Sequence, residues 1–111
     1  MKKILLFLLL GFVIVGCNEK EKSELDKILE EKNYIIVDVR TLEEYTEGHL
    51  KNAINLPYDQ IDNSISLEKE KKILVYCKSG RRSSIAKETL ERLGYSVYDL
   101  GAYENIELPK E

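Results

Sequence analysis

The sequence predicts an α/β fold, a small parallel sheet with helices on both of its faces. Short apolar runs rich in β-branched residues recur along the chain, at residues 34–39, 53–56, 73–77 and 95–100. Segments with turn signals or helical spacing separate these runs, so that strands and helices alternate. Alternation of this kind favours parallel strands joined by crossover connections, and the number of residues suits one domain.

The first residues predict an export signal. Lys2 and Lys3 precede an apolar run over residues 4–15, which at about a dozen residues is shorter than the roughly 20 that a spanning helix needs. The ending Ile14-Val15-Gly16-Cys17 resembles the bacterial lipobox, in which the cysteine is lipidated and becomes the mature N-terminus. We therefore expect a signal peptide over residues 1–16 and a lipid on Cys17. The alternative is an uncleaved helix that anchors the chain in the membrane.

Export with a lipid anchor implies a protein held at the membrane, in the bacterial periplasm or at the cell surface. Removing residues 1–16 leaves 95 residues, with 15 Lys and Arg against 20 Asp and Glu and a net charge near −5. An acidic surface argues against nucleic acid as a partner. The basic cluster at residues 78–82 stands out against this background and fits a small anionic ligand.

The segments up to residue 48 have recognisable helix signals. Residues 17–24 are read as the lipidated N-terminus and a tether, and the domain extends over residues 25–111. Ser23 suits the cap of a first helix that continues to Glu31. After the strand at 34–39, Thr41 and Glu44 form a capping box for a helix over residues 42–47, which Gly48 ends.

The second half begins with a short strand at 53–56, which Pro57 stops before a helical turn at 58–61. A polar approach over residues 62–71 leads to the central strand at 73–77. A helix over residues 83–93 follows, with Gly94 at its end. The last strand, at 95–100, is expected to close at Gly101.

Cys77 lies at the end of the central strand, in a basic loop that opens a helix. Such a loop points free backbone N–H groups inward, and the helix dipole adds to their preference for an anion. Lys78, Arg81 and Arg82 supply nearby cations, and Gly80 permits a positive φ. These features predict a thiolate near neutral pH. The alternative is that Cys77 is a small buried apolar residue.

The number of cysteines supports a reactive role for Cys77. The chain has two cysteines, and if Cys17 bears lipid, Cys77 is the single thiol of the exported domain. An intramolecular disulfide and a cysteine-based zinc site are then both excluded.

Three segments together resemble a single-domain rhodanese: V-D-V-R-T-L-E-E-Y-T-E-G-H-L-K-N-A-I-N-L-P (37–57), I-L-V-Y-C-K-S-G-R-R-S (73–83) and L-G-Y-S-V-Y-D-L-G (93–101). The resemblance implies a rhodanese-like fold and a sulfurtransferase that needs no cofactor or metal. It implies that Cys77 takes sulfane sulfur from thiosulfate and passes it to a thiophilic acceptor such as cyanide or a thiol. Cys77 to Arg82 has the six-residue length of sulfurtransferases, whereas related phosphatases use seven, so phosphatase activity is the weaker enzymatic hypothesis.

The same resemblance assigns the loop to substrate binding. Backbone N–H groups from Lys78, Ser79, Gly80, Arg81 and Arg82 would surround the persulfide. The side chains of the three cations are candidates for holding sulfonate oxygens, and Arg82 is favoured because guanidinium donates in pairs.

Asp38, Arg40 and Glu44 are expected to support the site. We expect an ion pair between Arg40 and Glu44; the alternative is that Asp38 orients a loop arginine. His49, the sole histidine, is expected to pack locally, because a preformed thiolate needs no general base.

The chain departs from the family pattern at Asn52, where glycine is frequent, and at Gly101-Ala102, which replaces Gly-Gly. The usual tryptophan near the end is absent, and Tyr103 or Ile106 is expected to fill its space. A binding module that carries sulfur without turnover on a rhodanese fold remains the competing hypothesis.

Overall fold

The computed structural model describes residues 23–111, and the chain divides into two units, residues 1–31 and 32–111. In the first unit, helix α1 (Glu24–Glu31) begins after Ser23, whose Oγ accepts a hydrogen bond from the backbone N–H of Asp26 at 3.1 Å. The predicted cap is confirmed. The predicted signal peptide over residues 1–16 and lipidated Cys17 lie outside the described residues. Within the described part, no helix has the length and apolar character needed to cross a membrane.

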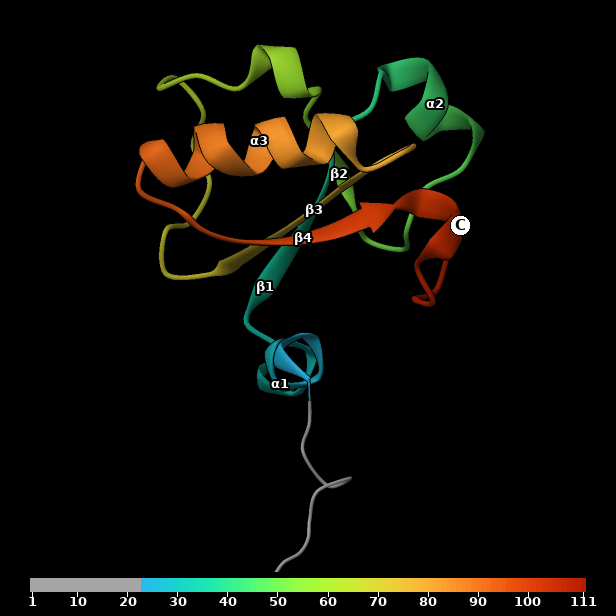
Figure 1. The fold of residues 1–111 in the computed structure, drawn as a ribbon, viewed down its shortest axis with the longest axis horizontal. Helices are drawn as coiled ribbons and strands as arrows, with labels where there is room; N and C mark the ends of the chain where they lie inside the picture. The colour runs from blue at the N-terminus through green and yellow to red at the C-terminus, as the bar shows by residue number, and fades with distance from the viewer. Residues whose placement is uncertain (1–22) are drawn as a thin grey trace, which may run out of the picture. The chain divides into compact units, whose positions relative to one another are not determined.

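The second unit is a four-stranded sheet with helices, which confirms the predicted α/β class (Figure 1). Its strands run parallel in the order β2-β1-β3-β4. The elements in chain order are β1 (Tyr34–Asp38), α2 (Leu42–Glu47), β2 (Ile54–Asn55), η3 (Tyr58–Gln60), β3 (Lys72–Cys77), α3 (Arg81–Arg92), β4 (Ser96–Ala102) and η4 (Tyr103–Asn105).

The register of β1 and β3 brings two candidate site segments to one edge of the sheet. Asp38, the last residue of β1, pairs with Tyr76, and Cys77 follows directly as the last residue of β3. The backbone N–H of Val39 donates to the carbonyl of Tyr76 at 3.0 Å, which extends the pairing past the strand end. Ligands of parallel sheets bind beyond this carboxyl edge.

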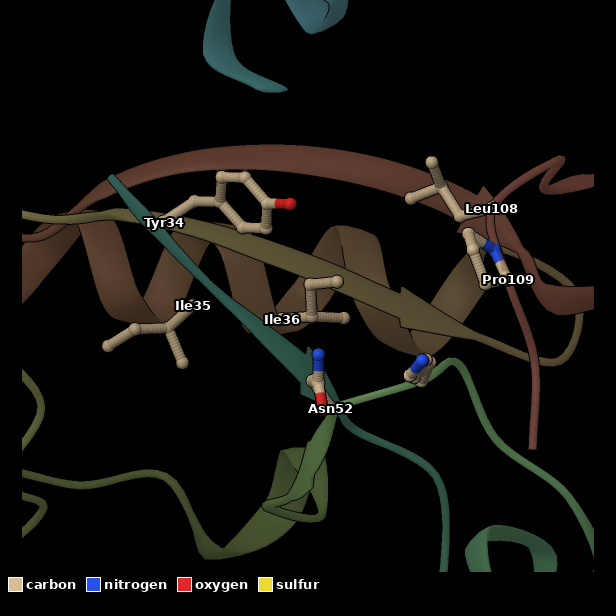
Figure 2. Close-up of a pocket in the computed structure, with 7 residues that line it drawn as sticks. Tyr34, Ile35, Ile36, Asn52, Leu108 and Pro109 are labelled. Carbon is tan, nitrogen blue, oxygen red and sulfur yellow. The ribbon is translucent and has the colours of Figure 1, made fainter. Parts of the chain in front are cut away.

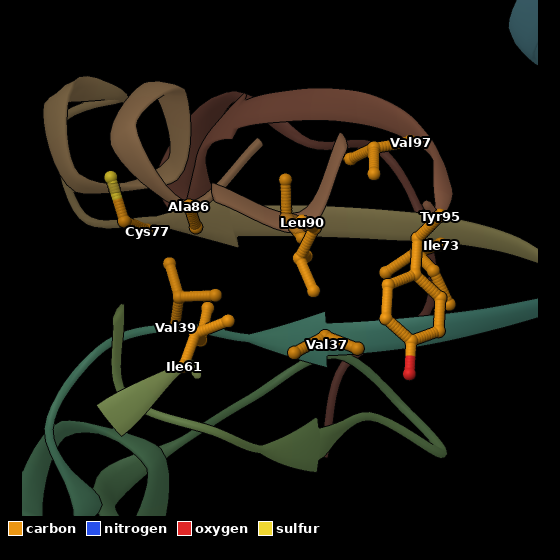
Figure 3. Close-up of a cluster of buried hydrophobic side chains, with 10 residues drawn as sticks. Val37, Val39, Ile61, Ile73, Cys77, Ala86, Leu90, Tyr95 and Val97 are labelled. Atoms are coloured by element: carbon orange, nitrogen blue, oxygen red, sulfur yellow. The ribbon is translucent and has the colours of Figure 1, made fainter. Parts of the chain in front are cut away.

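Cys77 belongs to the hydrophobic core between the sheet and α3 (Figure 3). Ala86 and Leu90 of α3 meet Val37 and Val75 of the sheet there, and all of them are fully buried. The remaining members of this cluster are Val39, Ile61, Ile73, Tyr95 and Val97. The core therefore fixes the position from which the thiol projects.

Several predicted element boundaries were wrong by one or two residues. β2 contains only Ile54 and Asn55, and α3 begins at Arg81, two residues before the predicted start. β4 continues through Gly101, which was expected to close it. The register shifts there, because Val75 pairs with Asp99 whereas Tyr76 pairs with Gly101, so that one residue is left over. Gly101 takes a φ of +88° at this bulge, which is a conformation that favours glycine.

Candidate active site

The sulfur of Cys77 is enclosed by the loop that follows it. The thiol is fully buried, and the backbone N–H of Gly80 donates to Sγ at 2.9 Å. As a neutral thiol, Cys77 donates to the Ser83 hydroxyl oxygen at 3.6 Å, and that hydroxyl donates to the carbonyl of Gly80 at 3.1 Å. When the sulfur is a thiolate, the Ser83 hydroxyl is the donor to it. Ser83 is fully buried as well. The loop thus folds back on the sulfur, which is contacted by Gly80 in the middle of the loop and by Ser83 directly after it.

Gly80 makes this turn possible. It stands at the N-cap of α3 with φ +98° and ψ −11°, as its place in the loop predicts. A Cβ added at this position would have no heavy atom within 4 Å, so space does not select glycine here. The left-handed backbone does, since it is costly for residues with a Cβ.

The pKa of the Cys77 thiol lies below its ordinary value. Burial raises it, but hydrogen bonds from the Ser83 hydroxyl and from the backbone N–H groups of Ser83, Gly80 and Ser79 together lower it by more. The direction agrees with the sequence prediction. The lowering comes mainly from N–H and hydroxyl donors, with the loop cations secondary.

Arg82 does not stand free in the loop, because Glu44 holds it. Nη1 of Arg82 donates to Oε1 of Glu44 at 2.9 Å, and Nη2 donates to Oε2 at 3.1 Å. This pair joins the first turn of α3 to α2, where Glu44 also completes the predicted capping box with Thr41. Hydrogen bonds from Arg82 outweigh the effect of burial and lower the pKa of Glu44 to about 2.

The predicted ion pair between Arg40 and Glu44 was wrong, since Arg40 pairs with Asp38. The backbone N–H and Nε of Arg40 donate to Asp38 Oδ1 at 2.9 and 3.0 Å, and Nη2 donates to Oδ2 at 2.7 Å. Two residues apart at the end of one strand, these groups meet at little conformational cost. Asp38 is therefore engaged by its neighbour, and the alternative in which it orients a loop arginine does not match its contacts.

A buried polar network extends from Asp38 across the face of the sheet opposite the thiol. The hydroxyl of Tyr76 donates to Asp38 Oδ2 at 2.8 Å and accepts from the backbone N–H of Leu50 at 3.0 Å. Burial raises the pKa of Tyr76, which keeps it a neutral donor. Tyr103 stacks on Tyr76, with ring centroids 5.7 Å apart, and lies 4.4 Å from the Arg40 guanidinium. Ile106, the other residue expected to fill the tryptophan's space, is buried, whereas Tyr103 is half-buried.

The other predicted loop residues face solvent to different degrees. Lys78, Ser79 and Arg81 are exposed, whereas Gly80 is half-buried. Lys78 borders a cavity of about 260 Å³, whose other lining residues are Arg40, Glu44, Glu47, Gly48, Tyr103 and Glu104. This cavity lies beside the active-site loop and at the end of β1.

A larger cavity of about 310 Å³ lies elsewhere and contains no residue of the loop (Figure 2). It is lined by Tyr34, Ile35, Ile36, Lys51, Asn52, Leu108 and Pro109. Of these two cavities, only the smaller one is lined by a residue of the loop, Lys78, and Cys77 lines neither.

The ring of His49 is occupied by local contacts. It stacks on Tyr45 with centroids 4.0 Å apart, and Nδ1 lies 2.9 Å from the carbonyl of Tyr45. Nε2 lies 3.7 Å from Glu111. Within residues 23–111, no group of three or more His, Cys, Asp and Glu side chains is arranged to hold a metal ion.

Sequence reasoning missed two buried polar residues. Ser83 was treated only as the residue after the loop, although its hydroxyl touches the thiol. Tyr76 lies within the apolar run of the predicted central strand, and no partner was predicted for its hydroxyl. Its position next to Cys77 was a usable signal, because alternate strand residues point to opposite faces and a polar tip buried there needs partners.

Comparison with known proteins places this site in a family. Residues 21–107 match the family model of the rhodanese-like domain. The chain is 37% identical over 78 residues to the thiosulfate sulfurtransferase PspE of Escherichia coli, a match that covers 67% of this chain and 75% of PspE. It is 34% identical over 90 residues to the thiosulfate sulfurtransferase GlpE of Coxiella burnetii, covering 77% and 84%. A solved rhodanese with anions from Escherichia coli superposes with a TM-score of 0.62 at 35% identity, covering 70% of this chain and 96% of that one.

Proposed function

The chain belongs to the rhodanese family, and on that premise we propose that it takes the sulfane sulfur of thiosulfate and transfers it through a persulfide on Cys77. Sulfur transfer follows from the family and from two thiosulfate sulfurtransferases among its relatives. One observation supports the role of Cys77 above others. The sulfur is held 2.9 Å from the N–H of Gly80, in a loop that lowers the thiol pKa.

The reaction has two displacements. The Cys77 thiolate attacks the outer sulfur of thiosulfate, a sulfur–sulfur bond forms, and sulfite leaves with the electron pair of the broken bond. The new terminal sulfur is anionic, and donors of the kind that already face Cys77 favour such a charge. A thiophilic acceptor such as cyanide or a thiol then attacks this sulfur and restores the thiolate.

Backbone amides are the main anion donors in this proposal. The N–H groups of Ser79 and Gly80 already lower the pKa of the thiol, whereas Arg82 is engaged by Glu44. Lys78 and Arg81 are exposed and add positive charge at the rim, where solvent screens it.

We further propose that the protein is exported and held at a membrane by lipid on Cys17. The support is the sequence of the first 17 residues, with two lysines, an apolar run and the ending Val15-Gly16-Cys17. The sulfur chemistry would then take place outside the cytoplasm, in the bacterial periplasm or at the cell surface.

Mass spectrometry tests the proposed reaction directly. Incubating the domain with thiosulfate should add one sulfur atom, about 32 Da, and cyanide should remove it, as expected for a covalent intermediate on the nucleophile. Cys77→Ser should abolish both steps. A sulfur that adds but is never passed to cyanide or a thiol would identify a sulfur carrier, and failure to add sulfur would contradict the proposed function.

A further inference from the structure

Glu44 is a fixed negative charge beside the active-site loop. Besides its two bonds with Arg82, its Oε1 accepts from the backbone N–H of Thr41 at 3.0 Å and from the Thr41 hydroxyl at 3.2 Å. The hydrogen bonds from Arg82 are the largest reason why its pKa falls to about 2. The carboxylate therefore stays ionised and in place at any pH at which a thiolate works.

The same carboxylate borders the cavity next to the loop. That cavity of about 260 Å³ combines the carboxylates of Glu44, Glu47 and Glu104 with the cations of Arg40 and Lys78. Lys78 follows Cys77 directly in the chain. An anion that approaches the loop along this side meets carboxylates as well as cations, and the carboxylates repel it.

Glu44 also occupies the guanidinium that would suit a sulfonate best. Guanidinium binds an oxyanion most strongly through two parallel N–H bonds, and both terminal nitrogens of Arg82 already bind Glu44 in this way. Arg82 is near enough to feel the charge of Cys77, which contributes to raising its pKa. A dianionic donor must therefore compete with Glu44 for this cation.

We propose that Glu44 is a specificity-determining residue, which shifts the preference of the enzyme from dianionic thiosulfate toward persulfides of lower charge. The proposal rests on the sulfurtransferase function given above. With a persulfide RSSH, the Cys77 thiolate attacks the outer sulfur and a new sulfur–sulfur bond forms. The bond between the two sulfurs of the donor breaks, and its electron pair leaves with RS⁻. The proton stays on the transferred sulfur, and the exchange needs no oxidant or reductant.

Steady-state kinetics with two donors tests this role. The donors are thiosulfate and the persulfide of N-acetylcysteine methyl ester, whose only ionisable group is the persulfide. Glu44→Gln keeps the side-chain shape and removes the charge; Glu43→Gln, on the exposed side of the same helix, removes the same charge away from Arg82 and is the matched control. Glu44→Gln should lower KM for thiosulfate by about 3- to 10-fold and KM for the persulfide less than twofold.

The effect of Glu44→Gln on KM for thiosulfate should shrink at high ionic strength, because salt screens the repulsion between the carboxylate and the anionic donor. Glu43→Gln should change the ratio of the two KM values by less than twofold. An unchanged ratio in Glu44→Gln, or a rise in KM for thiosulfate, would overturn the proposal, because either result means that Glu44 only braces the loop.

Alkylation of Cys77 provides a second measurement that needs no turnover. Iodoacetate is anionic and iodoacetamide is neutral, so the ratio of their rates reports the local potential and cancels the thiolate fraction. This ratio should rise about 3-fold or more in Glu44→Gln relative to Glu43→Gln, and equal ratios would overturn the proposal. Failure of the underlying sulfurtransferase function would be distinguished by another result, because the wild type would then acquire sulfur from neither donor.

Discussion

The backbone N–H of Gly80 points at the sulfur of Cys77 from 2.9 Å, within a loop that also turns the Ser83 hydroxyl toward the same atom. A nucleophile embedded in the core is therefore stabilised as an anion by its own following residues. The position of these donors depends on one left-handed glycine and one buried serine. Both can be tested separately.

Ser83→Ala should raise the pKa of the Cys77 thiol by about 0.5 to 1, on an estimate of about 1 kcal/mol for one hydrogen bond. The carbonyl of Gly80 keeps its bond from the N–H of Ser84 at 3.2 Å, so the loop should remain folded. The measurement is the rate of iodoacetamide alkylation as a function of pH. Ser84→Ala, at the exposed neighbouring position, should leave the curve in place; a shift of equal size there would contradict the role of Ser83.

Gly80→Ala should reduce sulfur transfer at least 10-fold, because alanine at φ +98° costs about 1–2 kcal/mol and the loop can relax by turning its N–H away from the sulfur. Gly101→Ala is the matched control. Gly101 also has a positive φ, +88°, and a Cβ there would likewise have no heavy atom within 4 Å. Thermal unfolding should show similar losses of stability for the two variants, while the thiol pKa should change only in Gly80→Ala.

The ion pair of Glu44 and Arg82 should make stability depend on pH in the acid range. The pKa of Glu44 is about 2 in the folded protein against 4.5 ordinarily, so its contribution is present above about pH 4.5 and is lost as the pH falls toward 2. Solvent screening at this partly exposed pair limits the contribution to about 1 kcal/mol. Urea unfolding between pH 2 and pH 7 should show that the free energy of unfolding falls less at acid pH for Glu44→Gln than for the wild type. Parallel curves for the two proteins would contradict a contribution from this ion pair.

Asp38→Ala should destabilise the protein by about 3–5 kcal/mol, because it leaves the guanidinium of Arg40 buried without its carboxylate. The double variant Asp38→Ala, Arg40→Met should recover part of this loss, since the unpaired charge is then gone. Denaturant unfolding of the two variants measures the difference. Equal stability of the single variant and the wild type would show that the pair contributes nothing.

Lipidation of Cys17 predicts that the wild-type protein partitions with membranes, because several acyl chains exceed the two hydrophobic signals that stable anchoring needs. Cys17→Ser should release the protein or leave it unprocessed. Fractionation of cells that express each form is the measurement. Full recovery of exported wild-type protein in the soluble fraction would contradict the anchor.

The sequence alone was enough for features that depend on neighbouring residues. The capping box of Thr41 and Glu44, the cap at Ser23 and the positive φ of Gly80 all lie within a few residues of their causes. The sequence did not predict which arginine pairs with Glu44. Either Arg40 or Arg82 could have paired with Glu44 in the predicted fold, and the one that Glu44 binds, Arg82, lies 38 positions away.

The choice between Arg40 and Arg82 was made by packing. Asp38 is only two residues from Arg40 and binds its guanidinium. Glu44 therefore pairs with Arg82, in the first turn of the helix that follows the loop. The role of Ser83 was hidden for a similar reason. Only when α3 starts at Arg81 instead of Ser83 does the first helical turn bring that hydroxyl back beneath the sulfur.

The bulge in β4 changes which face of the sheet the residues after it point to. Partner residues on parallel strands share a face, and the extra residue moves Ala102 to the partner position of Cys77. Without it, that position would fall to Gly101, and every later residue would exchange sides. Because β4 contains this one extra residue, Tyr103 lies on the side of Tyr76 and Arg40 and stacks on them. A single surplus residue thus decides which side of the sheet receives the aromatic ring that closes the buried polar network.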